Sequence, residues 1–567
     1  MNRPSTIPID PELRKGVPAA PSVADHSIAQ YLIRRLMDYG INHVFGIPGD
    51  YVLSFYTEME KSPLELVGCT REDCAGFAAD AYARVNGMGA VCVTYCVGGF
   101  SLCNSIAGAY AEKSPVVLIT GSPGLRERYN NPLLHHRVRD FRTQLEVFEK
   151  LCIAGTELND PSLAFREIDR VLDAAARYKR PVYIEIPRDV VNVVPDVHYQ
   201  YEQPQHASDP QALAEAVNEA VSRIGACQKP IIVAGVEIHR FGLQDKLLEL
   251  AEGTQIPLSA TMLGKSVIRE THPLYVGLYE GALGDDAVTK FVEDSDCVLL
   301  MGTYMSDINL GIYTANLDPG VCIYATSESL RIGHHHFHNV ELEDFVNELA
   351  AAQPASPQRV VPKTAENTET QFELNPDQQL TTTRMIARLN QSLDEETIVI
   401  ADIGDSLFAA TELVTRGRTE FISPAYYTTM GFSVPAAVGA QFARPDSRTV
   451  VVVGDGAFQM TGCELSTIIR HRQRVIVIVL NNEGYGTERV LHAGDWEFNE
   501  IPSWAYHKLP EVFGGGTGYE VRTEGEFDSA LGEAWASDEL SLIHVHLPRD
   551  DCSQALRRLA DKLKHRV

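Results

Sequence analysis

Short continuous runs of apolar residues recur along the whole chain, and an amphipathic stretch with helical spacing follows each run. The runs are rich in β-branched residues, which is typical of strands that are buried on both faces of a sheet. Because such strands alternate with helices, the pattern predicts an α/β protein with helices wound around parallel sheets. The clearest runs are Val91–Tyr95, Val116–Thr120, Val182–Ile186, Pro230–Ala234, Val298–Met301, Thr397–Ile400, Thr449–Val453 and Val475–Leu480.

Two segments lack this periodicity and have the composition of linkers. Pro195–Pro210 reads PDVHYQYEQPQHASDP, and Gln353–Gln379 is rich in Pro, Thr, Asn, Gln and Glu. They divide the chain into residues 22–195, 210–352 and 375–567, and each block has a usual domain size. We therefore predict three doubly wound parallel-sheet domains.

The overall composition is that of a globular protein and excludes several classes of function. Hydrophobic residues make up 44% of the 567 residues, and the formal net charge of -27 argues against a nucleic-acid partner. No stretch approaches the roughly 18 apolar residues of a membrane-spanning helix, and Met1–Ala20 lacks the apolar core of a signal peptide. The 11 cysteines include no Cys-x-x-Cys pair, which disfavours a disulfide framework or a zinc site. We expect a soluble cytoplasmic protein without membrane association.

The strongest chemical signal lies in the segment Thr449–Arg489. An apolar strand ends at Gly454-Asp455-Gly456, and a helix is expected to follow, with Thr461 and Glu464 spaced as a capping box. A second apolar strand then ends at Asn481-Asn482-Glu483-Gly484. In wound parallel sheets, ligands bind at the carboxyl ends of strands, so the two strand ends are predicted to share one site.

The residues at these strand ends suit a magnesium–diphosphate site. The side chains of Asp455 and Asn482 and the backbone carbonyl of Gly484 offer the hard oxygen ligands that Mg²⁺ prefers. Gly454 and Gly456 would let phosphate oxygens approach the backbone, and the following helix N-terminus offers free N–H groups. A plain strand–turn–helix is the alternative, but the Asn-Asn pair 27 residues after Asp455 argues against it.

These motifs resemble those of thiamine-diphosphate enzymes. GDG at 454–456 with NN at 481–482 is similar to their signature, and GYGTERVLHAG resembles decarboxylases that act on pyruvate, indolepyruvate and branched-chain 2-oxo acids. ADIGDSLF, MGFSVPAAVGAQ and GAYAEKSPVV are more similar to phenylpyruvate decarboxylases. The resemblance covers about Ile28 to Leu563. It implies pyrimidine-binding, middle and diphosphate-binding domains in that order, and non-oxidative decarboxylation of a 2-oxo acid to an aldehyde and CO₂ with thiamine diphosphate and Mg²⁺.

Glu72 falls on the position of the family's activating glutamate. It lies near the start of the Ala-rich, predicted helix Thr70–Arg84, where the helix dipole alone would also favour an acid. The resemblance implies that its carboxylate acts on the aminopyrimidine ring of the cofactor. It also implies that Glu72 and Asp455 serve one site from two chains, so that a homodimer is the minimal active unit and a homotetramer is the expected assembly.

Four further polar residues match the acid and base set of the decarboxylases. Asp50 ends the turn GIPGD, His135 and His136 lie in a predicted loop, and Glu488 lies on a predicted helix. Taken alone, Asp50 is more typical of a helix cap, the histidines of a solvated surface, and Glu488 of an ion-pair partner of Arg489. The resemblance implies that Glu488 assists carboxylate departure and later steps. It implies that Asp50 and His136 relay protons and that His135 orients their cluster.

The resemblance also indicates the rest of the cofactor site. Met430 would be the apolar prop between the cofactor rings. Asp405 stands where many pyruvate-type relatives carry Thr, and a carboxylate near a diphosphate is costly unless it turns away or is protonated. The remaining matched positions are Ser406, Thr428, Thr429, Ala457 and Tyr485.

The predicted substrate pocket favours large substrates. Pyruvate decarboxylases carry larger groups at the positions of Ile308 and Thr487, and one methylene changes discrimination by about 1–3 kcal/mol. We therefore predict a preference for longer aliphatic or aromatic 2-oxo acids over pyruvate. The other matched pocket positions are Ile403, Leu407, Phe408, Leu556 and Leu559.

Three alternative functions fit the sequence less well, and one histidine-rich motif invites a metal-binding interpretation. A carboligase such as acetolactate synthase uses the same cofactors but normally lacks the pair His135-His136 together with Glu488. A nicotinamide dehydrogenase would need a Gly-x-Gly-x-x-Gly motif after a strand, and a non-catalytic cofactor-binding regulator should have lost Glu72 or the histidine pair. The histidine run in Gly333–His338 lies in the middle block, and we interpret it as a structural or surface feature.

Overall fold

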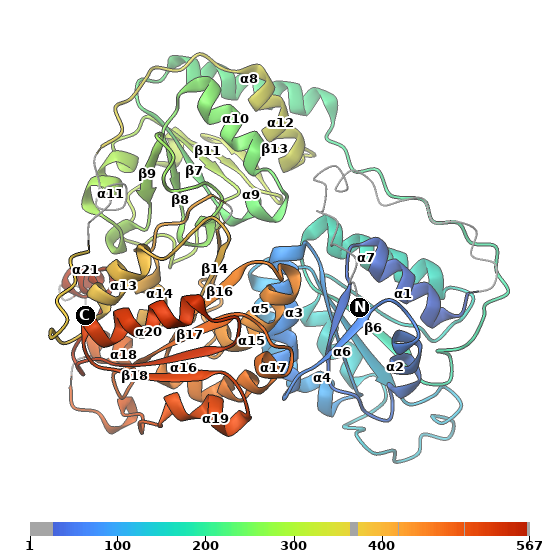
Figure 1. The fold of residues 1–567 in the computed structure, drawn as a ribbon. Helices are drawn as coiled ribbons and strands as arrows, with labels where there is room; N and C mark the ends of the chain where they lie inside the picture. The colour runs from blue at the N-terminus through green and yellow to red at the C-terminus, as the bar shows by residue number, and fades with distance from the viewer. Residues whose placement is uncertain (1–25, 363–371, 418, 493, 564–567) are drawn as a thin grey trace, which may run out of the picture.

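The computed structural model describes residues 26–362, 372–417, 419–492 and 494–563 of the chain. The predicted start of the first block at residue 22, the end of the last block at 567, and residues 363–371 of the second linker lie outside these ranges. The described chain forms three sheets with helices packed on both faces (Figure 1). The predicted class, three wound α/β domains, is confirmed.

The first sheet has six parallel strands in the order β2-β1-β3-β4-β6-β5. Successive residues of its central strands enter two different core clusters, as expected for strands covered on both faces. Its strands are β1 His43–Gly46, β2 Glu65–Gly68, β3 Gly89–Val93, β4 Val116–Ser122, β5 Ala154–Glu157 and β6 Val182–Pro187. Its helices are α1 Ile28–Asp38, α2 Leu53–Glu60, α3 Glu72–Asn86, α4 Val97–Ser101, α5 Cys103–Ala111, α6 Thr143–Leu151 and α7 Ala164–Tyr178.

The middle sheet has seven strands in the order β13-β12-β11-β10-β7-β8-β9, and only β12 and β13 run antiparallel to their neighbours. The histidine run falls at its free edge, where His334, His335 and His336 are all exposed. The strands are β7 Pro230–Ala234, β8 Leu258–Ala260, β9 Tyr275–Leu278, β10 Cys297–Met301, β11 Cys322–Ala325, β12 Leu330–Ile332 and β13 His335–Phe337. The α-helices are α8 Pro210–Ala226, α9 Val236–Arg240, α10 Gln244–Thr254, α11 Asp286–Glu293 and α12 Leu342–Ala352.

The third sheet has six parallel strands in the order β15-β14-β16-β17-β19-β18. The register of its central pair runs from Thr449 opposite Val475 to Gly454 opposite Leu480, so these strands end at the same level. The strands are β14 Thr397–Ala401, β15 Glu420–Ile422, β16 Arg448–Gly454, β17 Val475–Asn481, β18 Thr517–Val521 and β19 Ser541–His546. The α-helices are α13 Thr382–Asn390, α14 Asp405–Ala410, α15 Ser433–Ala443, α16 Asp455–Thr461, α17 Leu465–Arg470, α18 Gly486–Leu491, α19 Leu509–Phe513, α20 Glu524–Ala536 and α21 Gln554–Leu563.

The first and third domains pack against each other through α3 and α15 (Figure 1). Both helices are rich in alanine, which lets their backbones approach closely. A Cβ atom on Gly439 would lie 1.8 Å from the carbonyl oxygen of Ala78, so only glycine fits at this crossing. One hydrophobic cluster continues from the first domain into the third across this contact, which joins them into one body.

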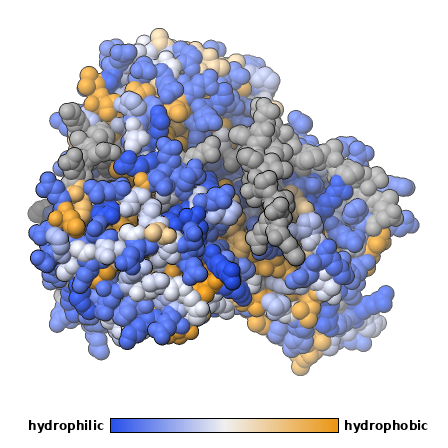
Figure 2. All heavy atoms as spheres, in the orientation of Figure 1, coloured by the Kyte–Doolittle hydropathy of each residue, from blue (hydrophilic) through white to orange (hydrophobic). Residues whose placement is uncertain are grey.

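The segment between the first and middle domains runs along the outside of the molecule (Figure 1). Residues 196–209 contain no helix or strand, in keeping with their linker composition. None of the helices in the described ranges has the length and apolar character needed to cross a bilayer. Figure 2 shows a face that is largely hydrophilic, with hydrophobic residues in small separate groups.

Candidate active site

The candidate catalytic residues lie at the carboxyl edges of the first and third sheets. Asp50 follows β1, and Glu72 follows β2 as the first residue of α3, where its side chain is half-buried. Asp455 follows β16, and Asn482 follows β17. This arrangement agrees with the rule that ligands bind beyond the carboxyl ends of parallel strands.

Asp50, His135 and His136 form one cluster at the edge of the first sheet. The Oδ2 atom of Asp50 lies 2.8 Å from Nε2 of His135, and the rings of His135 and His136 meet edge to face at 4.8 Å. Tyr51 stacks on His135 with ring centroids 4.7 Å apart, and burial together with the Asp50 carboxylate raises the pKa of Tyr51. The Nδ1 atom of His136 is buried and has no hydrogen-bond partner among the described residues, so it is available to a bound ligand.

A buried polar network supports this cluster from below, and the sequence did not reveal it. Tyr51 packs against Tyr95 and Cys96, and the Cys96 backbone has a left-handed φ of 50°. The N–H of Cys96 donates a hydrogen bond of 2.6 Å to Oε1 of Gln144, which lies on α6. Gln144 therefore holds the turn at Cys96, and this turn packs against Tyr51 beneath the histidine cluster.

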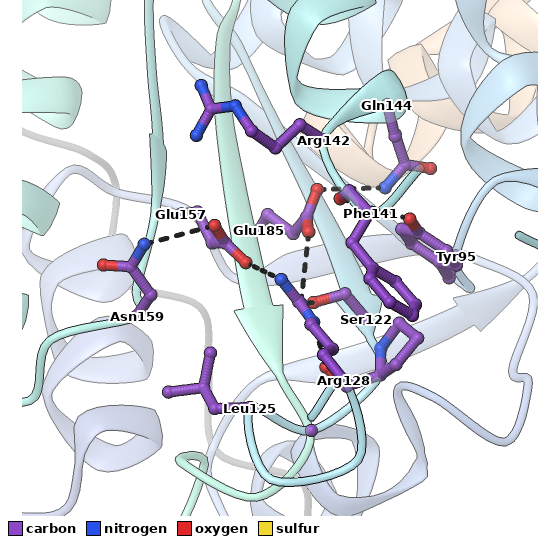
Figure 3. A network of polar contacts seen from close by, with 12 residues as sticks. Tyr95, Ser122, Leu125, Arg128, Phe141, Arg142, Gln144, Glu157, Asn159 and Glu185 are labelled. Atoms are coloured by element: carbon purple, nitrogen blue, oxygen red, sulfur yellow. Dashed lines mark hydrogen bonds and ion pairs between the residues drawn. The ribbon is translucent and has the colours of Figure 1, made fainter. Parts of the chain in front are cut away.

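The network continues to an acid on β6, the strand next to the edge strand β5 of the first sheet (Figure 3). Nε2 of Gln144 lies 3.4 Å from Glu185, and Arg128 lies between Glu157 and Glu185 (Figure 3). Glu185 is fully buried, and its burial raises its pKa to about 7. The sequence carried one signal for this network. Glu185 lies inside the apolar run VYIEIP, and an acid in a strand that is buried on both faces requires polar partners.

The two strand ends of the third sheet are joined through the Asp455 carboxylate. Its Oδ1 accepts from the N–H of Gly456 at 2.8 Å, and its Oδ2 accepts from the N–H of Gly484 at 3.1 Å. Burial raises the pKa of Asp455 to about 6. A Cβ atom on Gly454 would meet no atom within 4 Å, so open space adjoins this carboxylate. Asp455 and the backbone of Gly484 therefore meet near a free volume, and Asn482 lies two residues before Gly484 at the same strand end. Carboxylate, amide and carbonyl oxygens are the kinds of ligand that Mg²⁺ prefers.

The expected capping box at Thr461 and Glu464 does not form, and that prediction was wrong. The helix already begins at Asp455, and Thr461 is its last residue, with its hydroxyl donating to the carbonyl of Gly431 at 2.7 Å. Glu464 instead accepts hydrogen bonds from the backbone N–H and the hydroxyl of Thr70 in the first domain. The glutamate thus joins two domains rather than capping a helix.

Asp405 is turned toward the C-terminal helix. It is the first residue of α14, and its carboxylate accepts from the N–H of Ser553 at 2.9 Å and from the Ser553 hydroxyl. Burial raises its pKa to about 6. The hydroxyl of Ser406 donates to the carbonyl of Asp402 at 2.8 Å.

A second acid on the same segment holds the turn that carries Met430. Asp402 is fully buried and accepts from the N–H of Gly431 at 3.0 Å and from both the N–H and the hydroxyl of Ser433. Thr428 and Gly431 have positive φ angles of 57° and 82°, so the backbone is left-handed on both sides of Thr429 and Met430. The sequence signal for this contact was an acid, Asp402, directly after the buried strand β14.

The matched pocket positions lie around the contact of α14 with α21. Leu407, Leu556 and Leu559 are buried in the core there, together with Phe408. Three half-buried positions remain at its margin. Ile308 and Ile403 pack against this core, and the hydroxyl of Thr487 is buried without a hydrogen-bond partner in the described ranges.

Glu488 and Tyr485 lie beside the Asn482 strand end. The ring of Tyr485 packs against Gly456, where a Cβ atom would lie 2.8 Å from the ring. Glu488 on α18 is exposed. Arg489 donates to the backbone carbonyl of Asn482 at 3.0 Å and to that of Glu483. Its main hydrogen bonds therefore hold the strand end.

The chain matches three family models in sequence order. They are described as the N-terminal TPP binding domain, the central domain and the C-terminal TPP binding domain of thiamine pyrophosphate enzymes, and they cover residues 26–144, 217–352 and 402–545. The indole-3-pyruvate decarboxylase of Azospirillum brasilense is 36% identical over 542 residues, which cover 95% of this chain and 98% of that protein. The chain belongs to the thiamine-diphosphate-dependent 2-oxo acid decarboxylases.

Other decarboxylases align over nearly the same length. The alpha-keto-acid decarboxylase of Mycolicibacterium paratuberculosis is 32% identical over 548 residues, covering 94% of this chain and 96% of that protein. The pyruvate decarboxylase of Aspergillus fumigatus is 31% identical over 565 residues, covering 97% of both. The predicted family, thiamine diphosphate as the cofactor, and the decarboxylation of a small-molecule 2-oxo acid are thereby confirmed.

Proposed function

We propose that this decarboxylase prefers longer aliphatic or aromatic 2-oxo acids to pyruvate. The observation that carries the proposal is the small, half-buried Thr487 at the pocket margin, whose buried hydroxyl has no partner among the described residues. It lies 3.6 Å from where a Cβ atom on Gly404 would stand, next to Ile403. A small residue here leaves room for a larger substrate side chain, and relatives named for indole-3-pyruvate and alpha-keto acids are consistent with that reading.

We further propose that Asp455, Asn482 and the carbonyl of Gly484 hold Mg²⁺, which in turn anchors the diphosphate. When bound, thiamine diphosphate supplies the electron sink that decarboxylation requires. Glu72 would hold the proton of the aminopyrimidine ring, and Met430, with Thr428 and Thr429 before it, would support the cofactor. The other groups proposed to line the cofactor are Asp405, Ser406, Gly454, Gly456, Ala457 and Tyr485.

The reaction consumes one proton as the 2-oxo acid anion becomes an aldehyde and CO₂. We propose that Asp50 and His136 deliver this proton and that His135 orients them, which the 2.8 Å contact between Asp50 and His135 supports. Glu488, which lies at the edge of the third sheet, would assist the departure of the substrate carboxylate as CO₂. Its exposure in one chain is consistent with a site that a second chain completes.

The proposed active unit is a homodimer, with a homotetramer as the full assembly. Within one chain, Thr70 binds Glu464, the last residue of the 3-10 turn that follows α16, whereas Asp455 is the first residue of α16. The segment next to Glu72 therefore docks at the opposite end of this helical stretch from Asp455. A partner chain would supply the missing half of each site.

Exposed apolar side chains near both halves of the site support this pairing. Such groups are unusual on a surface that stays in water. Those in the loop of the histidine pair are Tyr129, Leu133 and Val138, and those after Glu488 are Trp496, Phe498 and Trp504. We also propose a cytoplasmic location, because all 11 cysteines are free thiols, as is usual in reducing compartments.

Aldehyde formation from a panel of 2-oxo acids tests the proposed preference. We expect kcat/KM to be higher for phenylpyruvate, indolepyruvate and 4-methyl-2-oxopentanoate than for pyruvate, and activity to require both thiamine diphosphate and Mg²⁺. The variant Thr487→Leu should lower kcat/KM for phenylpyruvate about tenfold or more, since it fills the pocket by more than one methylene, and should spare pyruvate. Glu343→Gln, an exposed position on α12 of the middle domain, is the control. A wild-type maximum with pyruvate would refute the preference.

A further inference from the structure

Three histidines and a glutamate gather at the free edge of the third sheet, and none of them is among the residues proposed to bind Mg²⁺. His507 lies in the 3-10 helix η7, Tyr506–Lys508, and Glu520 lies on the edge strand β18. His544 and His546 lie two residues apart on β19, and their rings are 4.1 Å from each other. Neither the predicted catalytic set nor the predicted cofactor set includes any of these residues.

The spacing of the ring nitrogens fits a tetrahedral metal ion. Nδ1 of His507 lies 3.3 Å from Nδ1 of His544. Two nitrogens bound to Zn²⁺ at 2.0–2.1 Å with tetrahedral geometry are separated by about 3.3 Å. Ligand atoms of His507, Glu520 and His544 all lie within 4.8 Å of one another. Glu520 lies 3.8 Å from the other ring nitrogen of His507, Nε2, and 2.8 Å from Nε2 of His546. The exposed Glu520 and the half-buried His507 would therefore have to turn to bring their donors onto one ion with His544.

The central histidine is held in a form that can bind a metal. His544 is buried, and its two ring nitrogens face two different partners. The amide of Asn481 lies 2.8 Å from its Nε2 and fixes the ring with Nδ1 toward His507. Such a partner on the second ring nitrogen is the usual support of a metal-binding histidine. Asn481 is itself positioned by the hydroxyl of Ser503 at 2.8 Å.

The surrounding charges allow a cation. The only cationic side chain within ion-pair distance of Glu520, apart from the histidines, is Arg522 among the described residues, at 2.8 Å. It is largely exposed, so it can turn into solvent when an ion binds. Imidazole nitrogens with one carboxylate select Zn²⁺, Co²⁺ or Ni²⁺ over Mg²⁺, which prefers oxygen ligands.

We propose that His507, Glu520 and His544, with His546 as the fourth ligand, bind one transition-metal ion of the Zn²⁺ class. The ion links η7, β18 and β19 and therefore fixes the edge strand of the third sheet. The site contains no thiolate, so the lack of a Cys-x-x-Cys pair does not argue against it. It also does not depend on the proposed substrate preference.

The test uses the full-length chain without an affinity tag, saturated with thiamine diphosphate and excess Mg²⁺ so that Zn²⁺ does not enter the Mg²⁺ site. Zn²⁺ is titrated by calorimetry, and bound metal is counted after gel filtration. We expect one Zn²⁺ per chain and a rise in the unfolding temperature on Zn²⁺ addition. His507→Ala and Glu520→Gln, which change partly exposed side chains, should each weaken binding about 10–100-fold.

The control variant is His335→Ala, which removes an exposed histidine that pairs with Glu219 at 2.8 Å. It should bind Zn²⁺ as the wild type does. Co²⁺ provides an independent readout: its spectrum should show weak d–d bands without a thiolate charge-transfer band. The proposal is overturned if no stoichiometric Zn²⁺ binds, if both variants bind as tightly as the wild type, or if the Co²⁺ spectrum reports a thiolate ligand.

Discussion

Replacing Glu185 by glutamine should make the first domain more stable at alkaline pH, although it removes a charge next to an arginine. Glu185 is fully buried in β6, and its Oε1 accepts no hydrogen bond from any residue that the structure describes. Its Oε2 accepts from the Tyr183 hydroxyl at 2.6 Å, a contact that a glutamine oxygen can keep. Arg128 is 3.6 Å away but also binds Glu157 and Ser122, so it does not depend on Glu185 alone.

The magnitude follows from the raised pKa of Glu185. Burial lifts its pKa from 4.5 to about 7 in the folded chain, and this shift corresponds to about 3 kcal/mol. Because the folded state favours the protonated acid, the native chain keeps this stability below pH 4.5. The folded chain loses this stability progressively as the pH rises from 4.5 through 7. Glutamine stays neutral throughout, so the stability of the variant relative to the wild type should rise over this window.

Differential scanning calorimetry at pH 5, 7 and 8.5 measures the effect. Glu185→Gln should match the wild type at pH 5 and exceed its unfolding temperature at pH 8.5 by up to about 6–12 °C, if the first domain unfolds as a unit of 150–250 residues. Glu149→Gln, an exposed position on α6, is the control and should show no pH-dependent difference. A variant that is less stable than the wild type at pH 8.5 would show that the charge of Glu185 stabilises the fold through Arg128, contrary to this reasoning.

Two further predictions concern the catalytic carboxylates. Glu72→Gln should keep the fold, because the side chain is only half-buried, and should lower kcat about 10²–10⁴-fold if it holds the activating proton; steady-state aldehyde formation and circular dichroism measure both. Asp455→Ala should abolish the Mg²⁺-dependent binding of thiamine diphosphate in calorimetry. Mixing the two inactive variants should restore about a quarter of the wild-type activity, because half of the randomly formed dimers are mixed and each holds one intact site. No recovery after verified subunit exchange would contradict a site shared by two chains.

The apolar runs located the strands because buried parallel strands carry their signal in the local sequence. All eight runs form strands, and the ends differ only slightly: the first run was placed at Val91–Tyr95, whereas β3 spans Gly89–Val93. That strand ends early because Cys96 adopts a left-handed φ, which breaks the extended backbone. A single non-glycine residue with positive φ leaves no signal in a hydrophobic pattern.

The polar network under the histidine pair could not be predicted for a different reason. Cys96 and Gln144 are 48 residues apart, and neither belongs to a recognisable motif. Their contact depends on how α6 packs against the first sheet, which is a tertiary property. By contrast, Asp50 and the pair His135-His136 were found because the family resemblance fixes them, and the structure places them in one cluster.

The end of β14 carries two acids, and each holds a different part of the third domain in place. Asp402 holds the turn of Met430 through the backbone of Gly431, while Asp405 holds the start of α21 through Ser553. Both acids satisfy their oxygens with protein N–H and O–H groups, so they are fixed in place rather than directed at a phosphate. Ile403 lies between them at the pocket margin. One short segment therefore ties the turn of Met430 and the start of α21 to the same strand, so that the proposed cofactor prop and the proposed pocket wall share one support.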